Sequence, residues 1–518
     1  MEPLVPTTRR QFLSQTAAAT LAAKTAPAAA DAPARPNLVY VFADQLRYHS
    51  CGYSGDEYAR TPNIDRLASE GCNFHQAISS TPVCSAYRSS LFTGKYTSST
   101  GMVINELRLS PEHECLGHAL TKGGYRTSYI GKWHMWANQL GHHDLTQNGF
   151  IPPGPYRLGF DGQWAAYNFN HEYYKSPYFE NDAQRHIRQG YEPDEQTDAA
   201  INFLKSAGRN PDPFALFLSW GPPHDPWDAT NVPPEYLDLF RNTNIPRRPN
   251  YSEIPDPYAD NWAHPGNDFY AHLADYQRVY YAQAATVDWN LGRLLRALDD
   301  TGLAANTILV FTSDHGEMFG SHGRRAKLIF YEEAARVPFL VRWPARIRPK
   351  QVSDTLLGTP DIMPTLLSML GLPIPRTVEG VDLSRHALSQ GGAGPEAAHM
   401  QGLGTTAAWT DGTEWRGLRD YEYTYAIYRR DGRELLFNNR RDPYQLRNLA
   451  EDKANDATLR HYRELSQTFR KERNDAFESC TWYRDHWTKD RNIVMTATGV
   501  TQNLDALQQL LRKWYPAG

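Results

Sequence analysis

Short apolar runs alternate along the chain with segments of helical periodicity, and this alternation constrains the fold most. The runs are NLVYVFA (37–43), RTSYIG (126–131), FALFLSW (214–220) and NTILVFTS (306–313). Runs of this length are typical of buried strands, whereas residues 61–71 and 282–302 have the spacing and end signals of helices. Strands that alternate with helices form a parallel sheet with helices on both faces. We therefore expect an α/β fold.

A change of composition near residue 390 predicts a second domain. SQGGAGPEAA (389–398) is typical of a linker. Beyond it, YEYTYAIYR (421–429) and RELLFNN (433–439) indicate two antiparallel strands joined by an Asp431–Gly432 turn, and a polar helix follows. The predicted boundary gives a large domain over residues 31–395 and a smaller C-terminal one over residues 396–518.

The first thirty residues have the pattern of a twin-arginine signal peptide. Arg9 and Arg10 precede a weakly apolar, alanine-rich run, and small residues before Asp31 offer a cleavage site. No later segment is apolar enough to span a bilayer. The net charge of −4 gives no sign of a nucleic-acid partner. We expect a bacterial protein without a stable membrane anchor, exported by the twin-arginine machinery to the periplasm or the medium.

Polar side chains follow each of the four apolar runs. Ligands bind beyond the carboxyl ends of strands in open α/β sheets. Two runs end in an acid followed by a neutral ligand: Asp44 and Gln45, and Asp314 and His315. These side chains give a mostly oxygen donor set that suits Ca²⁺ or Mg²⁺. An acid at a strand end can also cap the next helix. Basic groups near the same edge suggest a site that holds an anion: Lys132, His134, His224 and Lys327.

The segment TPVCSAYRSSLFTG (81–94) predicts a short helix that is capped by Thr81 and ends at Gly94. Cys84 would then lie in the first turn, with Arg88 one turn later on the same face. Three interpretations compete at this point. Cys84 is a buried structural residue, a thiolate nucleophile activated by the helix start and the guanidinium, or a residue that is not used as cysteine at all.

The motifs resemble those of the formylglycine-dependent sulfatases. Cys84, Ala86 and Arg88, followed by Thr93-Gly94, match the family signature, with Ala86 in place of the commoner proline. The resemblance extends over nearly the whole mature chain through RPNLVYVFADQ, TPNIDRLASEG, GKWH, PPHDP, SDHGE, KLIFYEEAARVPFLVRWP and DPYQLRNLA. It implies an alkaline-phosphatase-like fold: a large mixed sheet flanked by helices, with a smaller C-terminal α+β lobe that carries a short antiparallel sheet.

The resemblance also implies a chemistry. A maturation enzyme oxidises the signature cysteine to formylglycine, whose hydrate attacks sulfur with one hydroxyl and expels sulfate with the other. Arg88 would hold this group, Lys132 and His134 would contact it, and His224 and Lys327 would bind the sulfuryl oxygens and assist the leaving group. The implied metal ligands are Asp44, Gln45, Asp314, His315 and the formylglycine from Cys84, and the implied ion is Ca²⁺, with Mg²⁺ as an alternative.

Two other functions compete with sulfate ester hydrolysis. A phosphonate monoester or phosphodiester hydrolase shares the fold, the cysteine signature and an Asp-Gln pair, but GKWH favours the sulfatase. A non-catalytic binding protein with unmodified Cys84 would have lost polar residues that are all present here. The substrate stays open between a sulfated carbohydrate and an aryl sulfate. Loop aromatics and amides fit either sugar contacts or packing: Trp136, Asn138, Trp164, Tyr167, Asn168 and Trp227.

Overall fold

The computed structural model describes residues 35–499 and 502–515. All elements below belong to one compact unit that begins at Pro36. The predicted signal peptide, residues 1–30, lies outside the described residues. No helix within the described ranges is long and apolar enough to cross a membrane.

An eight-stranded sheet forms the centre of this unit, in the order β10-β2-β9-β8-β1-β7-β3-β4. The four apolar runs of the sequence are neighbouring strands: β8 (Thr307–Ser313), β1 (Asn37–Ala43), β7 (Phe214–Trp220) and β3 (Arg126–Lys132). They pair in parallel, as expected. The short strand β9 (Phe339–Arg342) is antiparallel to both neighbours, so the sheet is mixed. The remaining strands are β2 (Cys72–Ile78), β4 (Gln163–Tyr167) and β10 (Gln351–Gly358).

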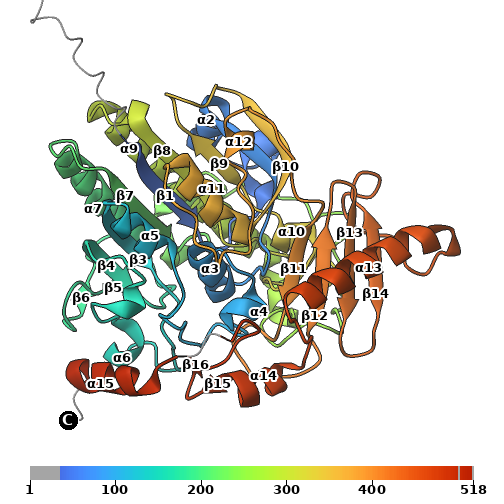
Figure 1. Ribbon diagram of the computed structural model, residues 1–518. Helices are drawn as coiled ribbons and strands as arrows, with labels where there is room; N and C mark the ends of the chain where they lie inside the picture. Colours follow the sequence, from blue (N-terminus) through green and yellow to red (C-terminus); the bar gives the residue numbers. More distant parts are fainter. Residues whose placement is uncertain (1–34, 500–501, 516–518) are drawn as a thin grey trace, which may run out of the picture. The chain divides into compact units, whose positions relative to one another are not determined.

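Helices cover both faces of the sheet, as the alternation of elements predicted (Figure 1). Side chains of a strand point alternately to its two faces. In β1, Leu38, Tyr40 and Phe42 pack with α3 (Cys84–Thr93), α5 (Leu116–Lys122) and α11 (Ile362–Met369). Val39 and Val41 pack on the opposite face with α2 (Pro62–Glu70), α7 (Glu192–Ala207) and α9 (Asn267–Asp300). The central strands are therefore buried on both sides.

A four-stranded antiparallel sheet follows in the C-terminal part: β11 (Ala398–Gly402), β12 (Trp415–Arg419), β13 (Tyr423–Tyr428) and β14 (Glu434–Asn438). The predicted hairpin is confirmed, because β13 and β14 pair antiparallel around Asp431 and Gly432. Helix α13 (Asp456–Glu472) crosses this sheet (Figure 1) and packs Leu459 and Tyr462 against it. The α/β fold with a small antiparallel sheet is thus confirmed, whereas the domain boundary at residue 395 stays a prediction.

The other elements are short and connect these layers. They are α4 (Thr97–Thr100), α6 (Thr146–Gly149), α8 (Pro234–Asp238), α10 (Glu332–Ala335), α12 (Ser384–Ala387), α14 (Cys480–Trp487), α15 (Leu504–Trp514), β5 (Pro177–Tyr178), β6 (His186–Ile187), β15 (Thr488–Lys489) and β16 (Asn492–Ile493).

Candidate active site

The carboxyl ends of β1 and β8 bring the four predicted metal ligands together. The two strands are paired neighbours, so Asp44 and Asp314 leave the sheet side by side. The backbone N–H of Gln45 donates to Asp314 Oδ1 at 3.0 Å. Asp44, Gln45, Asp314 and His315 are fully buried. Their position follows from the topology, because parallel strands end at the same edge.

Helix α3 presents Cys84 as its first residue, which corrects one detail of the sequence prediction. The capping position is Val83 rather than Thr81. The Thr81 hydroxyl is engaged with the Thr97 hydroxyl at 2.6 Å. The free N–H of Ser85 instead donates to Asn105 Oδ1 at 3.0 Å, so a distant loop caps the helix. The predicted end at Gly94 is correct, with a φ of 65° and an N–H that donates to Ser90 O.

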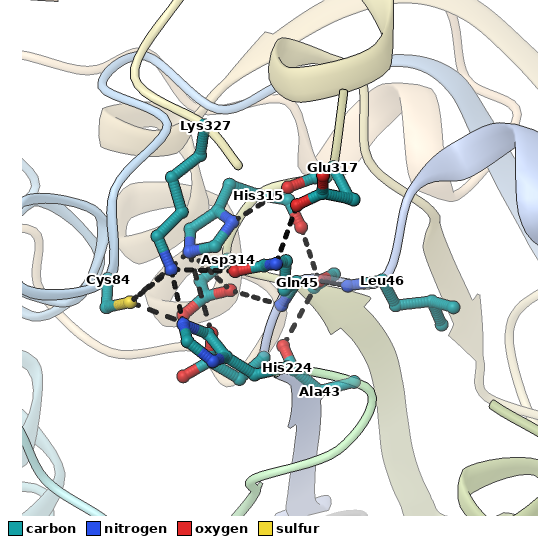
Figure 2. A network of polar contacts seen from close by, with 12 residues as sticks. Ala43, Gln45, Leu46, Cys84, His224, Asp314, His315, Glu317 and Lys327 are labelled. Atoms are coloured by element: carbon teal, nitrogen blue, oxygen red, sulfur yellow. Dashed lines mark hydrogen bonds and ion pairs between the residues drawn. The ribbon is translucent and has the colours of Figure 1, made fainter. Parts of the chain in front are cut away.

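The Cys84 thiol lies at the junction of the carboxylates and the basic groups (Figure 2). Its Sγ is 3.3 Å from His315 Nε2, 3.4 Å from Lys327 Nζ and 3.6 Å from Asp44 Oδ1. Burial, reinforced by Asp44, raises the pKa of Cys84 to about 11, although Lys132 and Lys327 oppose the shift. A thiol that stays protonated at neutral pH is a weak nucleophile. The contacts therefore argue against an activated thiolate.

The donor atoms around Cys84 fit a hard divalent cation. Ligand atoms of Asp44, Cys84, Asp314 and His315 lie within 4.8 Å of one another. His315 Nδ1 donates to the Gly316 carbonyl at 3.0 Å, which leaves the Nε2 lone pair facing the cluster. A backbone carbonyl on the far ring nitrogen is the usual support of a metal-binding histidine.

Gln45 contributes an amide oxygen that is already engaged. Lys327 Nζ donates to Gln45 Oε1 at 2.7 Å, and Gln45 Nε2 donates to Glu317 Oε2 at 2.7 Å. Figure 2 shows Gln45 between these two side chains. Gln45 therefore connects the carboxylate cluster to the basic side of the site.

Arg88 and Lys132 balance the buried carboxylates. Arg88 donates to Asp314 Oδ2 at 3.2 Å, to Ser219 Oγ at 2.8 Å and to the Lys132 carbonyl at 2.6 Å. Lys132 Nζ donates to Asp44 Oδ2 at 2.6 Å. Burial raises the pKa of Asp44, but Lys132 and neighbouring basic groups outweigh it and hold this pKa well below its ordinary value. Burial and Asp44 raise the pKa of Asp314 to about 6.

His134, His224 and Lys327 lie on the same side of Cys84. His224 Nε2 is 2.5 Å from Lys327 Nζ, and His224 Nδ1 is 3.1 Å from Asp225 Oδ1. Burial, and then the charge of Lys327, lower the pKa of His224 to about 4, so its imidazole is neutral and accepts from the ammonium. His134 is buried, and neither of its ring nitrogens has a hydrogen-bond partner among the described residues. The structure thus brings all the predicted basic residues together.

Sequence reasoning missed three supporting side chains. His171 Nε2 contacts Lys132 Nζ at 2.8 Å, and its ring lies 3.7 Å from that of His224. Ser219 holds Arg88, and Glu317 holds Gln45. Ser219 is the only residue with a hydroxyl group in the apolar run FALFLSW, so the sequence could have identified it as a site residue. His171 lies in a stretch without periodicity, so nothing local distinguished it.

The loop aromatics and amides that the sequence left open between sugar contacts and packing are buried. Trp164 and Tyr167 lie on β4 rather than on a loop. Trp136 and Trp164 are buried and carry arginine side chains on their rings, Arg108 at 4.0 Å and Arg157 at 4.4 Å. The other predicted contacts are buried as well: Asn138, Asn168 and Trp227. None of these six residues lines the cavity that contains Cys84, so their contacts favour packing.

A cavity of about 100 Å³ opens above Cys84. Its lining includes His134, His224 and Lys327, together with Glu106, Arg325 and Trp262, which we call the rim residues. A larger cavity of about 380 Å³ around Arg47 shares no lining residue with it. Cys84 and the basic residues His134, His224 and Lys327 therefore face the smaller cavity.

Comparisons with known proteins agree with this site. The Sulfatase family model matches residues 36–372, and the model of the N-sulphoglucosamine sulphohydrolase C-terminal region matches residues 320–474. The chain is 35% identical over 471 residues to an ulvan-active sulfatase of Formosa agariphila, covering 90% of this chain and 86% of the relative. It is 30% identical over 508 residues to an endo-4-O-sulfatase of Bacteroides thetaiotaomicron, covering 88% and 95%.

Solved structures show the same fold. The sulfatase YidJ of Bacteroides fragilis superposes with a TM-score of 0.76 at 32% identity, covering 88% of this chain and 99% of that one. A phosphonate monoester hydrolase of Agrobacterium radiobacter superposes with a TM-score of 0.67 at 22% identity, covering 90% and 100%, a likeness of fold alone. With the family match over most of its length and the buried cysteine site at the sheet edge, this chain belongs to the sulfatase family and is a sulfuric ester hydrolase.

Proposed function

We propose that this enzyme removes sulfate from a sulfated carbohydrate, using a formylglycine made from Cys84 and one divalent cation, Ca²⁺. The observation that carries the proposal is the position of Cys84. Its sulfur contacts the donor cluster on one side and Lys327 on the other. A reacting group at this atom would meet a metal and an anion-binding ammonium at once.

The names of two relatives support a carbohydrate substrate. One is called an ulvan-active sulfatase and the other an endo-4-O-sulfatase. Both alignments cover most of the two chains. From these names we take for this chain only the general class of substrate, a sulfated saccharide.

Asp44, Gln45, Asp314 and His315 would hold the cation together with the oxygen of the modified Cys84. Carboxylate and amide oxygens favour Ca²⁺ over softer ions. Such an ion supplies charge stabilisation for the anionic oxygens of the reacting group. Arg88 would fix the same group from behind, because its guanidinium already bridges Asp314 and the carbonyl of Lys132.

A formylglycine supplies a hydrated aldehyde, whose two hydroxyls serve as the nucleophile and as the group that later releases sulfate. A serine lacks the second hydroxyl, which explains why a cysteine precursor is present. The unpartnered nitrogens of His134 are available to take a proton from this group. Lys327 would bind a sulfuryl oxygen, and with His224 it would protonate the departing alkoxide.

Maturation and export complete the proposal. We infer that a formylglycine-generating or equivalent enzyme modifies Cys84 and that the twin-arginine machinery then carries the folded protein to the periplasm or the medium. Arg9 and Arg10 lie outside the described residues, so the support is the sequence pattern alone. Replacing both with lysine should retain the protein in the cytoplasm, and normal export of that variant would refute the route.

Peptide mass spectrometry and an activity screen test the proposal together. Active enzyme should show formylglycine in place of Cys84, and it should desulfate defined sulfated saccharides. Cys84→Ala should abolish turnover, whereas Cys51→Ala serves as the matched control because Cys51 is also buried and free. An unmodified thiol at Cys84 in fully active protein would overturn the mechanism.

A further inference from the structure

The rim of the active-site cavity carries charged side chains that the proposed reaction leaves unused. The cavity encloses about 100 Å³, which is small beside the pockets of about 300–1,000 Å³ that enclose drug-sized ligands. We expect it to take little more than the sulfate group of a saccharide. The remainder of any larger substrate must rest on the rim, where Glu106, Arg325 and Trp262 lie.

The Arg325 guanidinium lies 5.7 Å from the centre of the Phe269 ring. Its buried Nε has no hydrogen-bond partner among the described residues. The preceding Arg324 is different, because it donates to Asp256 Oδ2 at 2.8 Å. Asp225 lines the same cavity, but its carboxylate lies 3.1 Å from His224 Nδ1. Arg325 therefore lines the cavity with an unsatisfied hydrogen-bond donor that could bind an anionic group of a ligand.

Glu106 is a buried carboxyl group that lacks a partner at Oε2. Only 2% of the residue is exposed, and no described residue contacts this oxygen within hydrogen-bond distance. A buried polar atom without a hydrogen bond is costly. The side-chain oxygen of its neighbour Asn105, in contrast, accepts from the Ser85 N–H at 3.0 Å. A sugar hydroxyl that enters the cavity would satisfy Glu106.

Trp262 supplies the exposed aromatic surface that the buried tryptophans do not. It is 47% exposed and lines the same cavity. An indole ring at a cavity mouth presents a broad, rigid apolar face. Such a face suits the C–H surface of a sugar ring that projects outward from the sulfate-binding floor.

Backbone hydrogen bonds hold these rim segments in fixed positions. Asp260 accepts from the N–H groups of Trp262 at 3.1 Å and of Thr406 at 2.6 Å. The Arg325 N–H donates to the Ala263 carbonyl, and the Asn105 N–H donates to the Thr406 carbonyl. The segments around Asn105, Trp262, Arg325 and Thr406, which are distant in sequence, are thus joined before substrate binds. A preorganised rim loses little entropy on binding.

We propose that Arg325, Glu106 and Trp262 select an acidic sulfated saccharide, one that carries a second anionic group near the sulfate that is cleaved. Arg325 binds this second group, which is either a uronic acid carboxylate or another sulfate. Glu106 hydrogen-bonds to hydroxyls of the sugar, and Trp262 packs against its ring. The inference rests on the proposed carbohydrate sulfatase function and narrows its substrate.

Matched substrates test the selection. We would compare a sulfated disaccharide with a free uronic acid carboxylate, the same compound with that carboxylate reduced to an alcohol, and the alcohol form with a second sulfate. Hydrogen bonds to charged groups contribute enough to predict at least a roughly tenfold higher kcat/KM for one of the two acidic compounds than for the alcohol. The compound that is preferred identifies the second group. Equal kcat/KM values for all three would overturn the inference.

Variants assign the preference to the rim. Arg325→Gln should bring kcat/KM for the acidic compound to within about twofold of kcat/KM for the neutral one. General damage to the fold would lower both values and leave their ratio unchanged. Arg296→Gln, on the exposed side of α9, is the matched control and should keep the ratio. Glu106→Ala should raise KM for the preferred saccharide at least about fivefold with a smaller change in kcat. An unchanged ratio in Arg325→Gln would also contradict the inference.

An aryl sulfate separates this inference from the function on which it rests. Wild-type enzyme that cleaves aryl sulfate without preferring an acidic saccharide refutes the selection but leaves the sulfatase mechanism standing. Enzyme that is fully matured at Cys84 and cleaves no sulfate ester refutes both. Calorimetry on Cys84→Ser adds a binding readout, in which the acidic desulfated product should bind more tightly than its alcohol form.

Discussion

Asp475→Asn should destabilise the protein strongly, because it breaks a buried ion pair in the C-terminal sheet region. Asp475 accepts from Arg416 Nε at 2.5 Å and from Arg416 Nη2 at 2.6 Å. Gln401 Nε2 and the Phe477 N–H donate to the same carboxylate. Both charged side chains are buried. Removing one partner of a buried pair costs about 3–5 kcal/mol, and we expect the lower end because asparagine keeps one oxygen.

Urea unfolding, followed by tryptophan fluorescence, measures this cost. Asp452→Asn is the matched control, since Asp452 pairs with Arg447 at 3.0 Å on the exposed surface. Exposed pairs contribute at most about 1 kcal/mol, so this variant should unfold nearly as the wild type does. A loss below about 1 kcal/mol in Asp475→Asn, equal to that of the control, would refute the assignment of a strong buried pair.

The pH dependence provides a second check on the same pair. Burial raises the pKa of Asp475, but Arg416 and the donated hydrogen bonds outweigh it and hold the pKa below its ordinary value. A lowered folded-state pKa contributes stability above the unfolded pKa of about 3.9 and loses it as the pH falls further. The difference between wild type and Asp475→Asn should therefore be full at pH 7 and shrink below about pH 4. A difference that grows on acidification would contradict this sign.

Three further predictions concern the active site. Asp314→Asn should weaken Ca²⁺ binding at least about a hundredfold and remove activity, because loss of even an outer-sphere partner lowers metal affinity about 10–100-fold. Calorimetry that shows unchanged Ca²⁺ affinity would exclude Asp314 as a ligand. His224→Ala should slow substrates with alkoxide leaving groups about 10²–10⁴-fold and activated aryl sulfates far less, and equal losses in a leaving-group series would argue against proton donation. The matured enzyme should prefer a sulfate monoester over a matched phosphonate monoester or phosphodiester by at least about tenfold in kcat/KM, or ~1.4 kcal/mol. The reverse preference would favour the phosphorus ester alternative.

The sequence predicted the features that follow from strand topology. Asp44 and Asp314 each end an apolar run, and parallel neighbours must deliver such residues to one edge. The turn at Asp431–Gly432 was equally local, since its residue types favour a hairpin. The mixed sheet was implied only by the family resemblance, because the four residues of β9 are too few to indicate its antiparallel direction.

Contacts between distant segments could not be predicted. The cap of α3 comes from Asn105, twenty positions beyond the N–H that it satisfies. The aromatic residues near the site gave equal support to packing and to sugar binding. Their burial depends on partners such as Arg157, which lies under Trp164 only in the folded chain. Trp262 is also a tryptophan in a stretch without helix or strand periodicity, yet it is exposed whereas the others are buried.

The neutral side chain of Gln45 would allow the proposed site to attract both a cation and an anion. Arg88 and Lys132 form ion pairs with the carboxylates of Asp314 and Asp44, whereas Lys327 donates to the neutral amide of Gln45. An aspartate at residue 45 would hold Lys327 in an ion pair. The neutral amide still offers an oxygen donor while Lys327 keeps its charge available for a sulfuryl oxygen. Fixed positive charge in a buried site stabilises developing anionic oxygens most strongly. With a neutral Gln45, we therefore expect the site to bind the cation less tightly and the sulfate ester more tightly than it would with an aspartate at this position.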